Sequence, residues 1–397
     1  MKISVCIYAR NEEEHLENCI LSVLGIADEI ILLDNNSTDC TVDIAKKYHC
    51  RIKQVRDNTN IEGINRNQYL EDIEADWIIV LDPDECFDEE GAKRLIAACN
   101  AAPDDVLRIQ LPKYEYLGKG LFLDRQINSR CFRYHPDIQY SQQAMHCSIF
   151  MPKDKLYKTT YVNAPIHHYG ILNKAKTEVK RESYREKIIQ SIISPEESKT
   201  LPFMYVMLGA EYCAIDNYTE AHKLYRTAKE LAISDFDKLV ANMHMAFLYA
   251  KMNDYESAKR EAHLVIEIDS IWQERAYDLF ALLAYRERNL DECENNLRKS
   301  LSFRTTAPTL LNLASLLYKE QPEQAKCAIE KALQLNPYLL NPKIYGFGAS
   351  QNTFEFQSCY LPIFTNIFDI MISITEREEL TNNEHVYWKL KKSETIQ

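Results

Sequence analysis

The sequence predicts an α/β domain with a mostly parallel sheet and helices on both faces, followed by an all-α domain of repeated helical hairpins. Over the first hundred residues, short apolar runs alternate with segments of helical periodicity, as in a parallel sheet covered on both faces. From about Pro202 the pattern is helical throughout and repeats itself. A chain of 397 residues also exceeds what one hydrophobic core usually organises, so two domains are expected.

Five apolar runs are the expected strands of the first domain: Ile3–Tyr8, Glu29–Leu33, Arg51–Val55, Trp77–Leu81 and Val106–Leu111. The helix between the first two strands is expected to begin near Asn11 as its cap and to bury Leu16, Ile20, Leu21 and Val23. The polar run over residues 36–39 is expected to open the next helix. Open parallel sheets bind ligands at the carboxyl ends of their strands, so the site is expected there.

Four equivalent positions set the register of the helical repeat: Ala221, Ala258, Cys293 and Ala325. Their intervals of 37, 35 and 32 residues bracket the period of about 34 residues that is typical of tetratricopeptide repeats. Such hairpins stack into an extended surface that holds peptides or partner proteins. Bracing the first domain or forming a homodimer is the alternative role.

The expected organisation has four parts. A Rossmann-like catalytic domain over residues 1–175 leads through a helical linker over 176–201 to the repeats over 202–340. Residues 341–397 form a C-terminal extension without an assigned role, although it could serve a homodimer contact, as could the repeats.

Composition narrows the functional classes. The chain carries 59 acidic against 47 basic residues, which gives no general attraction to nucleic acid or anionic lipid. Its 12 cysteines contain no C-x-x-C pair and are expected to be reduced thiols in a cytoplasmic protein. We expect no signal peptide, because the polar run over residues 10–14 interrupts any apolar region near the start. We also expect no transmembrane segment, because the apolar stretch over residues 360–374 is interrupted and too short.

The strongest chemical signal is the triplet Asp82-Pro83-Asp84, which follows the strand Trp77–Leu81. Two neighbouring carboxylates at a strand end raise each other's pKa unless a cation intervenes, which favours bound Mg²⁺ or Mn²⁺. An acidic turn is the alternative interpretation. The first strand is followed by Ala9-Arg10-Asn11-Glu12 and not by a glycine-rich phosphate loop. A metal ion would therefore hold the diphosphate, as in enzymes that use nucleotide sugars.

Three motifs occur in a familiar order: Asn11-Glu12-Glu13, the segment from Asp28 to Asp39, and Asn65-Arg66-Asn67 followed by the segment from Trp77 to Glu85. With these motifs the first 170 residues resemble a family 2 glycosyltransferase of GT-A fold, in the subgroup with C-terminal tetratricopeptide repeats. Some similar enzymes glycosylate Cys or Ser of bacteriocin-like peptides, and others act on lipopolysaccharide or cell-surface glycans.

The resemblance implies roles for individual residues. Asp34 would bind the nucleobase, and Arg66 the base or the diphosphate. Asp82 would contact the ribose or the metal, and Asp84 the metal itself. Other nucleotide contacts are expected from the start of the domain, at Tyr8, Ala9, Asn11 and Glu12. Asp34 has the alternative of an Asx-turn and Arg66 that of a surface ion pair.

His168 matches the family's histidine before an aromatic-Gly pair, here Tyr169-Gly170, which returns to the metal. Neutral imidazole suits Mn²⁺, although a structural histidine is the alternative.

The catalytic base is the point at which the resemblance fails. Relatives commonly read Val-His-Glu where this chain has Met145-His146-Cys147. His146, Asp124 and Asp137 are the candidates, and an acidic thiol acceptor would need little help.

The implied reaction is inverting transfer of a hexose from a UDP-sugar. The acceptor would be a peptide Cys or Ser, with a lipopolysaccharide or cell-surface glycan as the alternative. A catalytically degenerate binding scaffold is the rival from another class.

Overall fold

The computed structural model describes residues 1–56, 62–118, 120–141, 149–152, 156–172, 174–193, 201–268, 272–340, 344 and 361. The chain divides into two compact units. The first comprises Met1–Glu115 and Asp124–Gly170, and the second comprises Tyr116–Leu123 and the chain from Ile171 onward. In the described ranges, no helix has both the length and the hydropathy needed to cross a membrane.

A mixed sheet with the order β3-β2-β1-β4-β7-β6-β11-β5 organises the first unit. Its strands are β1 (Ile3–Ala9), β2 (Glu29–Asp34), β3 (Arg51–Gln54), β4 (Trp77–Leu81), β5 (Glu85–Phe87), β6 (Val106–Gly118), β7 (Leu121–Arg133), β11 (Ile166–His168) and β10 (Lys158–Tyr161), which pairs with β6 outside this order. The strands β3, β2, β1 and β4 pair with one another in parallel, as predicted from the apolar runs.

The strand beside β4 differs from the expectation. The segment Val106–Leu111 was expected to continue a parallel sheet, but β7 lies between β4 and β6 and runs antiparallel to β4. Gly118 and Gly120 carry the turn of this β6–β7 hairpin with φ of 93° and 77°, a backbone conformation that favours glycine. Charged residues interrupt both strands, so their apolar pattern stops well before the strands do.

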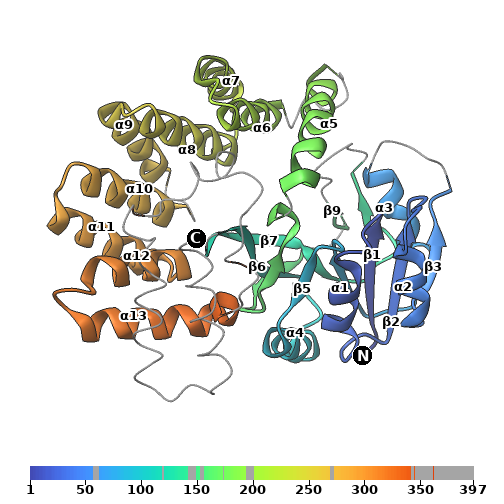
Figure 1. Cartoon of the computed structure of the whole chain (residues 1–397). Coiled ribbons are helices and arrows are strands. Elements are labelled where there is room, and N and C mark those ends of the chain that lie inside the picture. The colour runs from blue at the N-terminus through green and yellow to red at the C-terminus, as the bar shows by residue number, and fades with distance from the viewer. Residues whose placement is uncertain are drawn as a thin grey trace. The chain divides into compact units, whose positions relative to one another are not determined.

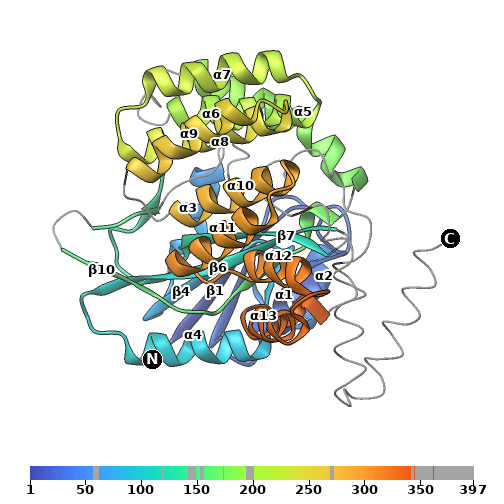
Figure 2. The ribbon, with the colours of Figure 1, turned by 90° about the vertical axis from the view of Figure 1, so that its left-hand side faces the viewer.

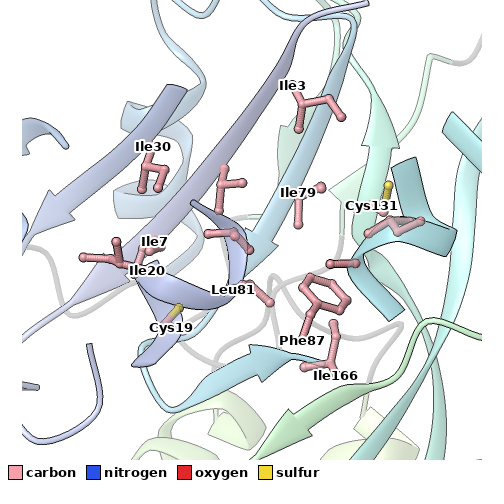
Figure 3. Close-up of a cluster of buried hydrophobic side chains, with 14 of the residues drawn as sticks. Ile3, Ile7, Cys19, Ile20, Ile30, Ile79, Leu81, Phe87, Cys131 and Ile166 are labelled. Carbon is pink, nitrogen blue, oxygen red and sulfur yellow. The ribbon is translucent and has the colours of Figure 1, made fainter. Parts of the chain in front are cut away.

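Helices cover both faces of this sheet. On one face lie α1 (Leu16–Val23), α2 (Thr41–Lys47) and α4 (Glu89–Ala101), and on the other lie α3 (Glu62–Leu70) and the small β8–β9 sheet (Gln139–Tyr140 and Ile149–Phe150). The period of two along β1 sends Ile3 and Ile7 to the first core and Cys6 to the second. Figure 3 shows Ile3 and Ile7 among the side chains of the first core.

The first helix starts later than its polar cap suggested. It begins at Leu16, because residues around Asn11 bond to the loop after β2 instead of capping the helix. Its buried stripe is Leu16, Cys19, Ile20 and Val23, with the helical spacing i, i+3, i+4 and i+7. Leu21 was expected in that stripe but is 49% exposed, since it lies on the opposite side of the turn.

Apart from the tip of the β6–β7 hairpin, the regular elements in the described part of the second unit are all helices. Short 3₁₀ turns lie at Gly170–Leu172 and Pro337–Leu340, and α5 (Lys174–Ile193) precedes the repeats. Four hairpins then follow in chain order (Figures 1 and 2): α6 (Leu201–Ala214) with α7 (Tyr218–Leu231), α8 (Asp235–Lys251) with α9 (Tyr255–Glu267), α10 (Gln273–Arg286) with α11 (Leu290–Phe303), and α12 (Ala307–Leu317) with α13 (Pro322–Leu335).

The turn inside each of the first three hairpins recurs with the repeat. A residue with positive φ ends the first helix, at Asp216, Asn253 and Arg288. The next residue then caps the second helix, because Asn217, Asp254 and Asn289 each accept a hydrogen bond from the backbone N–H three residues on. The same local turn, a positive-φ residue followed by a capping Asn or Asp, therefore forms three of the hairpins.

The small residues that set the register are all fully buried: Ala221, Ala258, Cys293 and Ala325. The approach of α6 to α7 requires a glycine, because a Cβ on Gly209 would lie 2.4 Å from the ring of Tyr225. These residues confirm the predicted tetratricopeptide-like packing.

Candidate active site

The carboxyl ends of three parallel strands bring the first group of predicted residues together. In the sheet register Ala9 pairs with Asp34, and Ile7 pairs with Leu81. Tyr8 at the end of β1, Asp34 at the end of β2 and Asp82 just after β4 therefore share one edge. This is the edge at which open α/β sheets hold ligands.

Backbone and side-chain hydrogen bonds tie the loops after β1 and β2 to each other. The Asn11 Oδ1 accepts from the Thr38 N–H at 2.7 Å, and the Asn11 N–H donates to the Ser37 hydroxyl at 3.0 Å. The Glu12 N–H donates to the Thr41 hydroxyl at 2.8 Å. Asn11 and Glu12 thus shape the rim of the site through these bonds, and φ of 55° at Asn11 is part of that shape.

Asp34 is buried at the base of this rim, with 1% of its surface exposed. Its two carboxylate oxygens share the N–H of Ser37, three residues on, at 3.2 and 3.3 Å, whereas an Asx-turn would bond to the residue two positions on. A carboxylate offers about four lone-pair sites, so this local bond leaves capacity to accept from a ligand. The local bond and the nucleobase role are therefore compatible.

A polar network links Tyr8 to α3. The Tyr8 hydroxyl accepts from the side-chain amides of Asn35 at 2.9 Å and Asn65 at 3.1 Å. The Arg66 guanidinium lies over the Tyr8 ring, 5.4 Å from its centroid. Two buried atoms beside this network have no hydrogen-bond partner among the residues that the structure describes: Asn35 Oδ1 and Arg66 Nη1. A bound ligand would satisfy atoms of this kind.

Arg66 and Arg130 hold Asp82 between them. The Arg66 Nη2 donates to Asp82 Oδ1 at 2.5 Å while its Nε donates to Glu62 at 2.6 Å, and Arg130 from β7 donates to Asp82 Oδ2. Burial alone would raise the pKa of Asp82, but the two guanidinium groups hold that pKa well below its ordinary value. Arg66 is 5% exposed, so the surface ion pair considered from the sequence does not describe it.

The charge network continues across the neighbouring strands. Glu85 accepts from Arg130 and pairs with Lys113, both at 2.8 Å. Lys113 also lies 3.4 Å from Glu115, which accepts from Arg125 at 2.5 Å. Sequence reasoning missed these charged residues, since their partners are distant along the chain. The only early signal was the presence of charge inside otherwise apolar strands β6 and β7.

Asp84 and His168 form the second half of the site. The Asp84 Oδ2 and His168 Nε2 atoms are 3.4 Å apart, and both side chains are mostly buried. Burial alone would raise the pKa of Asp84, but His168 lowers it to about 2. A Cβ on Gly170 would lie 1.9 Å from Asp84 Oδ2 and 3.1 Å from His168 Nε2, so only glycine fits here. His168 thus lies beside Asp84, the residue from which the resemblance implies a direct contact with the metal.

The acidic and histidine side chains of the site differ in how well they could bind a metal ion. The described residues contain no group of three or more His, Cys, Asp or Glu side chains arranged around one metal position. Asp82 was predicted as a metal ligand, but its oxygens are bound by Arg66 and Arg130. Asp84 and His168 present one oxygen and one nitrogen at a separation that suits two ligands of one ion. Asp84 and His168 thus offer two donor atoms that suit a metal ion, whereas the Asp82 oxygens accept hydrogen bonds from Arg66 and Arg130.

The three residues predicted as candidate catalytic bases differ in their positions relative to the site. Asp137 is 67% exposed and pairs with His135, in the turn after Arg133. Because Arg133 pairs with Trp77, the first residue of β4, Asp137 lies at the opposite edge of the sheet from Asp82. Asp124 lies partly buried on β7. His146 falls outside the described residues.

The site combines a buried carboxylate, two arginines and an Asp–His pair at the strand ends of an α/β unit. This is the architecture of an enzyme that binds an anionic ligand. Residues 4–158 match the model of Glycosyl transferase family 2, so the first domain is similar to that family over this segment. Of the site residues described above, His168 and Gly170 follow the matched segment.

Several curated proteins are similar to parts of the chain. A TPR repeat-containing protein of Synechococcus elongatus is 30% identical over 36% of this chain and 34% of its own length. The prophage-derived glycosyltransferase SunS of Bacillus subtilis is 26% identical over 55% of this chain and 51% of its own length. The poly(ribitol-phosphate) β-N-acetylglucosaminyltransferase TarS of Staphylococcus aureus is 28% identical over 28% of this chain and 21% of its own length. The chain thus spans about half or less of these relatives.

Among solved structures, glucosyl-3-phosphoglycerate synthase of Mycobacterium tuberculosis with Mn²⁺ and UDP-glucose is 22% identical to this chain. The match covers 28% of this chain and 43% of that one, with a TM-score of 0.26. The similarity to family 2 rests on the sequence match over residues 4–158.

Proposed function

We propose that the chain is a metal-dependent, inverting glycosyltransferase that moves a hexose from a UDP-sugar to an acceptor. One observation carries the proposal. Within or next to the family 2 segment, the ends of β1, β2 and β4 bring Asp34, the Arg66–Asp82 pair and the Asp84–His168 pair to a single edge of the sheet.

The donor nucleotide is assigned to the Asp34 side of this edge. The buried Asp34 carboxylate would accept the N3–H of uracil, and Arg66 Nη1, buried and without a partner, would donate to the base or to a phosphate oxygen. Asp82 pairs with Arg66 and, from the same strand end, would contact the ribose. Tyr8 and Ala9 would form the floor beneath the nucleoside.

Asp84 and His168 would hold Mg²⁺ or Mn²⁺, with diphosphate oxygens and water as the remaining ligands. When bound, such an ion neutralises charge on the departing nucleoside diphosphate. The transfer breaks the bond from the anomeric carbon to the diphosphate oxygen and forms a bond to the acceptor atom on the opposite face of the sugar. The acceptor's proton passes to a base.

His146 and Asp124 are the proposed candidates for that base, and Asp137 is not proposed because of its place at the other edge of the sheet. The base can be identified from the kinetics of its variants. Loss of the base lowers kcat by about a hundredfold or more while KM changes little, and it removes the acidic limb of the pH–rate profile. His146→Ala and Asp124→Asn, compared with Asp137→Asn, would identify it.

For the acceptor we propose a Cys or Ser side chain of a peptide held by the helical repeats, whose stacked hairpins form an extended surface. A glycan or glycopolymer acceptor is the second candidate, and it is supported by the similarity to TarS, which by its name acts on poly(ribitol phosphate). A degenerate binding scaffold is the third. Peptide and glycan arrays with UDP-[¹⁴C]glucose would separate these acceptors.

The first test is calorimetric titration of UDP into the full chain with and without Mn²⁺. We expect Mn²⁺ to tighten UDP binding at least tenfold in the wild type and to have no effect in Asp84→Ala. Asp34→Ala should weaken UDP binding while the response to Mn²⁺ persists. Absence of UDP binding under every condition would contradict the UDP-sugar mechanism, and GDP, CDP and dTDP would then be titrated in the same way.

A further inference from the structure

The imidazole of His168 lies between two carboxylates. Its Nε2 is 3.4 Å from Asp84 Oδ2, and its Nδ1 is 3.9 Å from Glu115 Oε1. The second separation is too long for a hydrogen bond, and within the described part of the chain Nδ1 is buried without a hydrogen-bond partner. A buried polar atom of this kind requires an explanation, and the Glu115 carboxylate is an acceptor that lies beside it.

Sheet register brings Glu115 and His168 together. His168 on β11 is the direct partner of Glu115 on the parallel strand β6, and β11 also pairs with β5 at Glu85. Two neighbouring strands therefore hold the Glu115 and His168 backbones side by side. Their spacing does not depend on a loop, which suits a residue that must fix another residue's orientation.

Glu115 is kept as an anion by its own partners. Arg125 donates to it at 2.5 Å and Lys113 lies at 3.4 Å, while the side chain is only 14% exposed. Arg125 binds Oε2, whereas Lys113 lies beside Oε1, the oxygen that also faces His168 Nδ1. A carboxylate oxygen has two lone pairs, so Oε1 can accept from the ring while Oε2 stays bound to Arg125.

We propose that Glu115 is a positioning residue that accepts the Nδ1–H of His168 and so turns Nε2, as the unprotonated nitrogen, toward a divalent metal shared with Asp84. The inference rests on the metal site of the proposed function. Ligating histidines usually donate their second ring N–H to a carboxylate or carbonyl, which fixes the tautomer and the ring orientation. Loss of such a partner typically weakens metal binding about tenfold to a hundredfold.

The adjacent histidine provides an internal comparison. His167 Nε2 lies 3.1 Å from Asp88 Oδ2, and both side chains are fully or almost fully buried. Asp88 also caps α4 by accepting from the Gly91 N–H at 2.7 Å. This His–carboxylate pair has an evident structural role, whereas the His168–Glu115 pair faces the site. Asp88→Asn is thus a matched control, since asparagine preserves the cap.

The experiment measures Mn²⁺ binding to the full chain by electron paramagnetic resonance, with and without UDP. We expect Glu115→Ala to weaken Mn²⁺ binding about tenfold to a hundredfold, with Glu115→Gln between it and the wild type. Pulsed measurements should detect ¹⁴N coupling from a coordinated imidazole in the wild type and lose it in His168→Ala. Asp88→Asn should bind Mn²⁺ within twofold of the wild type, and melting curves verify that each variant is folded.

The outcomes separate the inference from the proposed function. If wild type binds Mn²⁺ with ¹⁴N coupling and Glu115→Ala and Glu115→Gln do so equally well, Glu115 has no positioning role while the metal site stands. If wild type binds Mn²⁺ without ¹⁴N coupling, His168 is a structural bridge between two carboxylates and the inference fails. If wild type with UDP binds no Mn²⁺, the metal site fails and the inference fails with it.

Discussion

At the scale of single residues, Asp82 shows that residues distant in sequence can determine what a local motif binds. The Asp82-Pro83-Asp84 triplet predicts two metal ligands, because neighbouring carboxylates repel each other without a cation. The structure supplies the cations from the protein itself, through Arg66 and Arg130. Arg130 is 48 residues away in sequence, so no local pattern could show that it takes this role.

Gly170 offers a sharp test of the other carboxylate. An alanine Cβ there would lie 1.9 Å from Asp84 Oδ2, so the carboxylate would have to move from His168. We expect Gly170→Ala to weaken Mn²⁺-dependent UDP binding at least tenfold, measured by calorimetry. Gly25→Ala is the control, since a Cβ at Gly25 meets nothing within 4 Å. Equal binding by both variants would show that the position of Asp84 does not matter for the metal.

Much of the candidate site was predictable because parallel strands end at a common edge. Asp34, Asp82 and Asp84 each follow an apolar run, so periodicity alone places them near one another. Glu85, Lys113 and Glu115 were not predicted, since they lie within strands and pair across the sheet. A buried charge is evident only when its partner is known, and that partner depends on sheet register.

At the scale of elements, local apolar runs predicted the strands β1 to β4, whereas β7 depends on pairing between distant parts of the chain. Trp77–Leu81 was found to the residue because all five of its side chains are buried, which leaves a continuous apolar run. The strand β7 carries Asp124, Arg125 and Arg130, and its antiparallel pairing with β4 depends on a hairpin that returns from β6. The repeats were predictable because each hairpin packs mainly on its neighbours, so one local pattern recurs.

The α6–α7 hairpin provides a test of that local packing. A Cβ on Gly209 would lie 2.4 Å from the fully buried ring of Tyr225, so one of the two helices must shift. We expect Gly209→Ala to lower the free energy of unfolding of the helical unit by about 1–3 kcal/mol, measured by urea titration followed by circular dichroism. Arg226→Ala on the exposed side of α7 should change it by less than about 0.5 kcal/mol. A Gly209→Ala protein as stable as wild type would mean that the helices are less tightly packed than described.

At the scale of the whole molecule, the division into units does not follow the linear order of the chain. The sequence predicts one boundary near residue 175, whereas the tip of the β6–β7 hairpin, Tyr116–Leu123, belongs with the helical unit. The Tyr116 hydroxyl donates to Asn336 at 3.2 Å, across 220 positions of sequence. Periodicity reports only neighbours along the chain, so it could not predict a hairpin tip that joins a later unit.

The helical unit also contains a carboxylate that should make its stability depend on pH. Asp278 on α10 is partly buried and accepts from the Thr309 hydroxyl at 3.0 Å. Burial raises the pKa of Asp278 to about 7, above the value near 3.9 that an unfolded chain would show. Between these two values the folded unit holds a proton that the unfolded chain has released, so the contribution of Asp278 to stability falls as pH rises through this window.

Asp278→Asn removes that titration and keeps an oxygen for Thr309. We expect the free energy of unfolding of Asp278→Asn, relative to wild type, to rise by about 1–2 kcal/mol between pH 5 and pH 8, a figure reduced for partial exposure. Urea titration of both proteins at each pH measures it, because other titrating groups cancel in the difference. Asp254→Asn is the control: its hydrogen bonds with Ser257 lower the pKa of Asp254, so its effect should be constant over the same range. A pH-independent difference for Asp278→Asn would mean that Asp278 is ionised in the folded unit throughout, and that Thr309 and its neighbours compensate its burial.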